Sequence, residues 1–420
     1  MPDNGLENIE ELTEIEAEEP AEIEVKELPP VITSRRRRMG FTAWWRSRSG
    51  AWDLFDSLTA GERRRAGLPQ GAWSVDYLGK AMWVVFVLIV ISGIGLLAGY
   101  VPTVSGAFSS VERIQNEMSL GWWFRGVHKW GTDLFIILGI LRLVRLAYRR
   151  GYKSTGEFTW IWALLVLAIG MAAGLTGYLL VWHQRAFWMG SVLQSDPMAS
   201  ESVQPLGGLG LKGWVAERIV GGVQVTQSAL TIIFVIHIAL GFIVLLSAFC
   251  LRLIARRLVP KYRHFSLCIP PGLVWAILGF LTFIALILPP PVGGPSDGIL
   301  TPMPILSDWY FLGCYQLIGA LTPTIAGWLI GIGFLVGFLL PWIDRSRAKG
   351  ARPAVTLLIA AGLLTWLIFT LKALGWAVAD YGILVITALV WLIALILAAM
   401  AEYRPRKAES DESEGEVVPE

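Results

Sequence analysis

The chain has 420 residues, of which 55% are hydrophobic and 16% charged, and its formal net charge is +2. Its mean hydropathy is +0.57. Because a soluble globular domain carries about 25% charged residues, this composition excludes that class and indicates a polytopic membrane protein.

Eight apolar runs are long enough to cross a bilayer, which takes about 20 residues of helix. Each is predicted to be helical, because lipid offers no hydrogen bonds to backbone polar groups. The runs are Tyr77–Tyr100, Trp122–Ala147, Phe158–Trp182, Val225–Ile254, Pro271–Leu288, Thr324–Ile343, Ala354–Leu371 and Gly382–Ala401. The predicted fold class is therefore an all-α polytopic membrane protein with about eight transmembrane helices.

Lysine and arginine gather on one side of this eight-helix arrangement. They lie in Arg35–Arg38, Arg149–Lys153, Ala255–His264 and Asp344–Arg352, and in the tail after Arg404. Cytoplasmic loops of membrane proteins carry an excess of these residues. We therefore expect a multi-pass protein of the cell membrane with both termini in the cytoplasm and the alternate loops outside.

The two ends of the chain differ in composition from the apolar runs. Residues 7–27 hold ten glutamates, which predicts a disordered tail over residues 1–40, and an acidic tail is expected again over 404–420. Segment 41–75 mixes tryptophans with many charges. This mixture favours an amphipathic helix in the membrane interface, although an ordinary solvated connector explains it too.

Three of the four histidines lie in or beside predicted spans, where an ionisable group is costly. His264 lies in a basic loop and is interpreted as polar surface. His128 is near the outer start of the second span and His237 about halfway along the fourth. Both spans run inward, so the two imidazoles can meet at one depth and hold a haem b. A membrane histidine also serves as a packing residue, and both interpretations stay open at this point.

Glycines add a second signal. Gly79 and Gly93 are fourteen residues apart on the first span, which places them on nearly one face, and Gly177 lies near the end of the third. Glycines there would let a flat macrocycle approach the backbone. Small residues also mediate plain helix packing in membranes, so this pattern is ambiguous by itself.

Four stretches carry a resemblance to a known family: Ala107–His128, Glu157–Trp188, Gly221–His237 and Asp308–Tyr315. Together they resemble the cytochrome b subunit of quinol-oxidising cytochrome bc and b6f-type complexes, over about residues 75–400. The resemblance implies a haem-binding four-helix bundle over residues 76–265. A four-helix C-terminal part with a quinol-site motif follows over residues 266–403.

The resemblance also implies a role for each residue at a matching haem position. His128 and His237 match the histidine pair that ligates the iron of the outer haem. Arg125 matches the arginine that neutralises a haem propionate, and Gly93 and Gly177 match the small residues against that haem.

Other matches concern the quinol site. Asp308 and Tyr310 stand in place of the family's Pro-Glu-Trp-Tyr motif, whose carboxylate accepts a proton from quinol, while Tyr178 and Phe187 match the wall of the outer quinol site. Alternatively, Asp308 only caps a helix that begins near Trp309. His183 stands where relatives have glycine or aspartate, and it is either a proton relay or a surface histidine.

The family's second histidine pair is absent. Its positions hold Arg142 and Leu251, and neither side chain can ligate haem iron. Ala163 replaces a glycine expected near that inner haem, although Gly79 remains. We therefore expect a single haem b. Arg142 either occupies the face that bound the lost haem, about 21 Å along the helix from His128, or extends to the cytoplasmic headgroups.

The function predicted from sequence is a membrane subunit of an electron-transfer complex that oxidises quinol at the outer face and passes electrons through one haem b. Expected partners are a Rieske iron–sulfur protein, cytochrome c subunits or both, in a dimeric multi-subunit complex within the lipid bilayer, with no nucleic acid. A partner's cofactor, another pigment or a non-bifurcating role must compensate for the lost haem. The alternative is a haem-poor quinone-binding scaffold that anchors peripheral redox partners, so whether the chain takes part in catalysis stays open.

Overall fold

The structure is a computed structural model, and it describes most of the chain between residues 77 and 402. The described residues are 77–148, 151–152, 157–190, 226–258, 269, 271–299, 306–321, 323–344, 353–375, 377 and 380–402. The predicted terminal tails, the predicted interfacial segment 41–75 and His264 lie outside these ranges. Every regular element among the described residues is a helix.

Each of the eight apolar runs forms a helix, as the sequence predicts. The helices are α3 (Tyr77–Leu97), α5 (Gly121–Tyr148), α6 (Glu157–Leu180), α10 (Gln227–Leu258), α11 (Pro271–Ile287), α13 (Pro323–Ile343), α14 (Pro353–Ala373) and α15 (Asp380–Glu402). Six of them are long and apolar enough to cross a membrane by composition alone. The other two are α11, which has 17 residues, and α5, which has 28 residues and carries several charges. The chain is thus a polytopic membrane protein.

Two shorter helices, in addition to a short helical segment at residues 184–190, lie between the long ones. α4 (Ala107–Asn116) connects α3 to α5, and α12 (Trp309–Ala320) precedes α13. The sequence indicated a helix start near Trp309 but not the α4 helix. α4 buries one side, formed by Ala107, Ser110, Val111 and Ile114, and leaves its charged side exposed.

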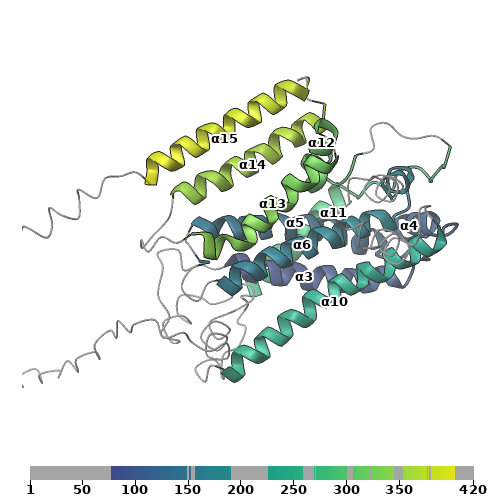
Figure 1. The fold of residues 1–420 in the computed structure, drawn as a ribbon. Coiled ribbons are helices and arrows are strands. Elements are labelled where there is room, and N and C mark those ends of the chain that lie inside the picture. The colour runs from purple at the N-terminus through teal and green to yellow at the C-terminus, as the bar shows by residue number, and fades with distance from the viewer. Residues whose placement is uncertain are drawn as a thin grey trace, which may run out of the picture. The chain divides into compact units, whose positions relative to one another are not determined.

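Helices α3, α5, α6 and α10 form a bundle in which α5 contacts α3 and α6, and α6 contacts α10. Helix α11 packs against α5 and α3. Figure 1 shows α10 at one edge of these helices and the paired helices α14 and α15 at the opposite edge. The end of the bundle at which α3 ends and α5 begins is called the histidine end below, because His128 lies there.

Glycines bring the helices of this bundle close together. A Cβ added at Gly131 would lie 3.0 Å from Ile89 on α3, and one at Gly139 would lie 3.0 Å from Leu167 on α6. Lipid tails are as apolar as side chains, so association inside a membrane depends on such close van der Waals packing. α5 is therefore held at the centre, between α3, α6 and α11.

The segments after α6 and α11 contact each other at the histidine end of the bundle. α6 ends where Trp182, which is 2% exposed, adopts a φ of 57°, a left-handed conformation that cannot continue a right-handed helix. The chain then turns into a helical segment at residues 184–190. The amide of Gln184 donates to the carbonyl of Gly294 at 3.0 Å, so the loop after α11 lies against this segment.

Candidate functional site

The two histidines predicted to form a pair do so. His128 on α5 and His237 on α10 place their ring centroids 6.0 Å apart, with the ring planes at 66°. Each ring Nδ1 lies near a backbone carbonyl of a third or fourth helix: Ile89 of α3 at 2.9 Å from His128, and Ala173 of α6 at 3.0 Å from His237. A carbonyl only accepts hydrogen bonds, so both Nδ1 atoms carry the proton and both Nε2 atoms keep a lone pair.

The same arrangement supports both rings. On α3, Ile89 supplies the carbonyl. Three residues later the hydroxyl of Ser92 lies 3.3 Å from Nδ1 of His128, and Gly93 comes next in the sequence. On α6 the carbonyl of Ala173 is followed by the hydroxyl of Thr176, 3.1 Å from Nδ1 of His237, and then by Gly177. We call these two groups the imidazole cradles: Ile89, Ser92 and Gly93 on α3, and Ala173, Thr176 and Gly177 on α6.

The glycines of the cradles are needed for space. A Cβ added at Gly93 would lie 3.0 Å from Cε1 of His128, and one at Gly177 would lie 2.9 Å from Cε1 of His237. Such distances force a neighbour to shift. The glycines predicted to admit a macrocycle therefore also admit the imidazole rings themselves.

This geometry fits a bis-histidine haem. A metal–imidazole bond is about 2 Å long, and the ring centroid lies about 1.1 Å behind the bonded nitrogen, so two imidazoles on opposite sides of one metal have centroids roughly 6 Å apart. The observed spacing of 6.0 Å meets that requirement. A hydrogen bond from the other ring nitrogen to a carbonyl is also typical of metal-bound histidine.

Arg125 lies one turn before His128 and is 8% exposed. Its guanidinium donates to the side-chain oxygen of Gln115 on α4 and to the carbonyls of Pro290 and Pro291 after α11, at 2.6 to 2.8 Å. All three acceptors are uncharged, so its positive charge is not balanced by a carboxylate among the described residues. Arg125 thus ties α4 and the loop after α11 to the bundle, and it keeps a charge that suits a propionate.

Asp308 lies directly before α12, as the motif predicts, and its carboxylate accepts a hydrogen bond from the hydroxyl of Tyr310 at 3.1 Å. Asp308 is at the N-cap position of α12, but its side chain makes no capping hydrogen bond. The interpretation of Asp308 as only a helix cap is therefore not supported. Burial raises the pKa of Asp308, with Lys129 opposing this shift and Asp133 adding to it.

Two charged residues beside Asp308 were not singled out from the sequence. Lys129 and Asp133 lie one turn apart on α5 and form an ion pair with a distance of 2.7 Å, and Nζ of Lys129 is also 3.5 Å from Asp308. The other oxygen of Asp133 accepts a hydrogen bond from the indole of Trp309 at 3.0 Å. A lysine and an aspartate inside an apolar run were the available signal, because such charges are costly in a membrane.

Tyr178 and His183 pack together with ring centroids 5.1 Å apart, and the hydroxyl of Tyr178 donates to the carbonyl of Leu306, two residues before Asp308. The amide of Phe187 donates to the carbonyl of His183. The predicted wall residues thus lie together, next to the segment that carries Asp308.

The surroundings of His183 favour its neutral form. Burial, with the nearby guanidinium groups of Arg125 and Arg185, lowers its pKa to about 4. The amide of Ala186 donates to its Nδ1 at 3.1 Å, so Nε2 carries the proton. A charged histidine is thus disfavoured here near neutral pH.

The opposite end of the bundle holds Gly79 and Arg142, both buried. The side chain of Arg142 is 1% exposed, so it stays within the protein rather than extending to headgroups. Lys80, on the first turn of α3, is also 1% exposed. Leu251 falls in the last turns of α10, where the structure describes the helix but not the side chains.

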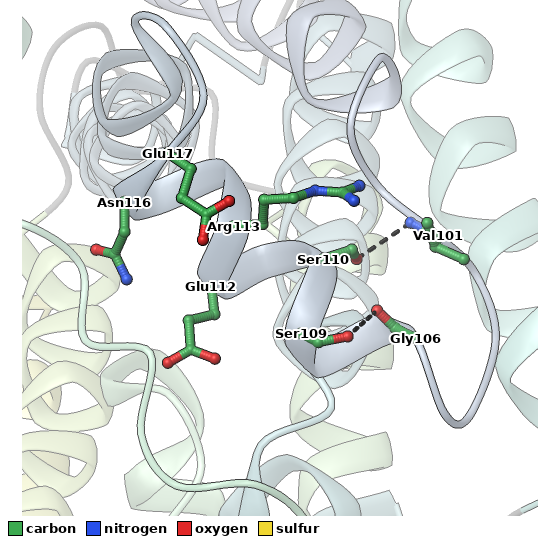
Figure 2. Close-up of a pocket in the computed structure, with 8 residues that line it drawn as sticks. All are labelled: Val101, Gly106, Ser109, Ser110, Glu112, Arg113, Asn116 and Glu117. Carbon is green, nitrogen blue, oxygen red and sulfur yellow. Dashed lines mark hydrogen bonds between the residues drawn. The ribbon is translucent and has the colours of Figure 1, made fainter.

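A cavity of about 400 Å³ lies on α4 at the histidine end (Figure 2). Its lining residues are Val101, Gly106, Ser109, Ser110, Glu112, Arg113, Asn116 and Glu117. None of the predicted site residues lines it. The cavity is therefore separate from the paired histidines and from Asp308.

The fold and the paired histidines define a class: a multi-pass helical membrane protein with a bis-histidine site inside its bundle. Comparison with known families places the chain within that class. Residues 69–257 match the family described as cytochrome b/b6/petB, and residues 295–396 match the family described as cytochrome b(C-terminal)/b6/petD. These two matches cover more than half of the chain, which therefore belongs to the cytochrome b family.

Individual relatives agree with this assignment. A cytochrome b of Rickettsia bellii is 28% identical over 299 residues, which are 65% of this chain and 72% of the relative. The cytochrome b subunit of a cytochrome bc complex of Chlorobaculum thiosulfatiphilum is 27% identical over 318 residues, or 70% and 71%. A solved chain of a hyperthermophilic respiratory Complex III shares the fold, with a TM-score of 0.62, 23% identity, and coverage of 77% of this chain and 90% of that one.

Membership of this family fixes the coarse function. The chain is a membrane electron-transfer subunit of a bc-type complex, and its family implies both haem b and an interaction with quinone. It follows that other subunits assemble with it.

Proposed function

We propose that this chain oxidises quinol at the histidine end of its bundle, with one haem b held by His128 and His237 and with Asp308 as the proton acceptor. The observation that carries the proposal is the pair of imidazoles 6.0 Å apart, each fixed through Nδ1 by a carbonyl. Arg125 would face a propionate, and Tyr178, Phe187 and the other wall residues would border the quinol.

Oxidation of a quinol to a quinone releases two electrons and two protons. A haem b on the two histidines would supply the acceptor for one electron, and a one-electron carrier of a partner subunit, such as a Rieske iron–sulfur protein or a cytochrome c, takes the other. Of the two protons, this chain takes up one, and the other passes to water at the outer side. The carboxylate of Asp308 accepts one from a quinol hydroxyl, and the hydroxyl of Tyr310 holds that carboxylate in place.

The loops rich in lysine and arginine indicate how the protein is oriented in the membrane. We propose that the histidine end faces the outside of the cell membrane and that both termini are cytoplasmic. Quinol would enter from the bilayer, since the site lies among membrane helices. The protons would then leave on the outer side, as the electrons pass to partner subunits in a multi-subunit complex, which we expect to be dimeric.

Haem content tests the proposal. A pyridine haemochrome assay on the purified full chain should give about one b haem per chain, and added quinol should reduce it. His128→Ala and His237→Ala should each abolish haem binding, because each removes one of the two residues that would hold the haem, whereas His183→Ala should keep the haem spectrum.

Two results would contradict this assignment. Two haems per chain would mean that ligands other than these histidines bind iron. No haem in the native protein would favour the second candidate, a quinone-binding scaffold for peripheral redox partners, which the arginine and leucine at positions 142 and 251 keep open.

A further inference from the structure

Three charged side chains meet where α5 contacts the start of α12. Nζ of Lys129 lies 2.7 Å from Oδ2 of Asp133 and 3.5 Å from Oδ1 of Asp308. The side chains of Asp133 and Asp308 are 9% and 16% exposed. One ammonium group is thus shared between two sheltered carboxylates, one of which is the proposed proton acceptor.

The ammonium group is not shared equally. A distance of 2.7 Å is a full charge-assisted hydrogen bond, whereas 3.5 Å is beyond the usual range of about 2.7 to 3.2 Å for N–H···O bonds. Lys129 is therefore neutralised chiefly by Asp133. Asp308 receives only part of the stabilisation that a cation at contact distance would give.

Asp133 is fixed in this position. Its Oδ1 accepts a hydrogen bond from the indole of Trp309 at 3.0 Å while its Oδ2 binds Lys129. Trp309 is the first residue of α12 and follows Asp308 directly. The carboxylate therefore cannot turn away from Lys129 without losing its hydrogen bond from Trp309.

The other groups that face Asp308 are uncharged phenols. Tyr310 on α12 donates its hydroxyl to Asp308, and Tyr178 on α6 donates its hydroxyl to the carbonyl of Leu306, two residues before Asp308. Helix α14 contributes Trp366, whose indole donates to the carbonyl of Tyr310 at 3.2 Å. Among the described residues, Lys129 and Asp133 are thus the charges that act most strongly on Asp308.

We infer that Asp133 is a positioning residue for quinol oxidation: by holding Lys129 away from Asp308, it keeps Asp308 basic enough to take the quinol proton. This inference rests on the proposed function. In the step itself, one quinol O–H bond breaks and an O–H bond forms on Asp308, the second quinol proton passes to water, and Lys129 and Asp133 keep their charges. The electrons leave to the two one-electron acceptors named above.

The inference predicts opposite effects for two substitutions. Asp133→Asn removes a negative charge and frees Lys129 to bind Asp308, so the pKa of Asp308 should fall. Lys129→Gln removes the only cation in the group, so that pKa should rise. The shift should be about one pH unit or more in each direction, the size that a single charge at this distance produces.

Two measurements on the full chain read out this pKa. The first is the pH dependence of quinol-dependent haem reduction, normalised to bound haem, because the rate should rise with pH as Asp308 ionises. The second is an infrared titration, made without quinol, of the absorption band of the protonated Asp308 carboxyl group. This band is identified by its loss in Asp308→Asn. Glu112→Gln, which alters an exposed carboxylate on α4, is the control and should leave both midpoints unchanged.

The outcomes separate the inference from the proposed function. Midpoints that move down in Asp133→Asn and up in Lys129→Gln support the inference, and either variant alone tests it if the other does not fold. The inference is overturned if the midpoints in the two variants do not move or if they move in the same direction. In that case, slow haem reduction in Asp308→Asn would still support the proposed function. If Asp308→Asn changes neither the haem-normalised rate nor its pH profile, both the proposed function and the inference fail.

Discussion

At the scale of single residues, the proposed electron and proton chemistry falls on neighbouring positions of one helix. His128 directs Nδ1 to a carbonyl of α3, and Lys129, the next residue, points instead to Asp133 and Asp308. Consecutive residues on a helix point in directions about 100° apart. α5 can therefore border a haem on one face and the quinol carboxylate on another.

The role of Asp308 can be tested by two substitutions. Asp308→Asn should leave haem binding unchanged and slow quinol-dependent haem reduction by roughly a hundredfold or more, the usual cost of a missing general base. Asp308→Glu should keep much of the rate, because it lengthens the side chain by one methylene group but keeps the carboxyl group that accepts the proton. Stopped-flow reduction per bound haem measures both, and an unaltered rate in Asp308→Asn would leave this carboxylate with a structural role only.

At the scale of helices, α3 and α6 act as matching supports for the two helices that carry the paired histidines. In each imidazole cradle a carbonyl is followed three residues later by a hydroxyl and four residues later by a glycine. The carbonyl fixes the tautomer and orientation of the ring, which raises its basicity as a ligand. The glycine sets how closely the helix can approach the ring. Both features lie on helices that carry neither of the paired histidines.

Alanine at either cradle glycine should weaken haem binding. Gly93→Ala would place a methyl group 3.0 Å from Cε1 of His128, and Gly177→Ala would place one 2.9 Å from Cε1 of His237. The ring must shift, and a disturbed support around a metal ligand typically costs roughly tenfold or more in affinity. Haem retention during competition with apomyoglobin measures this loss.

Gly331→Ala is the matched control, since a Cβ there meets no atom within 4 Å. It should retain haem as the native protein does. Equal retention in all three variants would show that the cradle glycines do not limit the approach of the rings.

At the scale of the whole molecule, the two ends of the bundle differ. The histidine end carries the paired imidazoles, Arg125 and the acidic group at Asp308, whereas the other end buries Lys80 and Arg142. The proposed redox site therefore lies at one end of the bundle, and two buried cations lie at the other.

An even number of crossings predicts that both termini lie on the same side of the membrane. The positive loops make that side the cytoplasm. A green fluorescent protein fused after Glu420 should therefore fluoresce, and alkaline phosphatase fused after Gly294, in the loop beyond α11, should be active outside. If the fluorescent protein fused after Glu420 is dark and alkaline phosphatase fused after Glu420 is active, the number of crossings is odd.

The sequence by itself determined the eight helices and their approximate ends, because the bilayer requires long apolar runs with satisfied backbones. It also led to a prediction of which residues could bind iron, since the chain holds only four histidines. The pairing of His128 with His237 followed from their depth in two helices that run in the same direction, and the structure brings these two rings together.

Only the tertiary structure decided which side chains face one another across helices. The contact of Asp133 with Trp309 joins residues 176 positions apart, and neither the imidazole cradles nor the buried position of Arg142 could be read from spacing. The physical reason is that lipid and the protein interior are equally apolar. The hydrophobic pattern of a membrane helix therefore shows that it spans, but not how it is rotated about its axis, and this rotation brought Lys129 and Asp133 to Asp308.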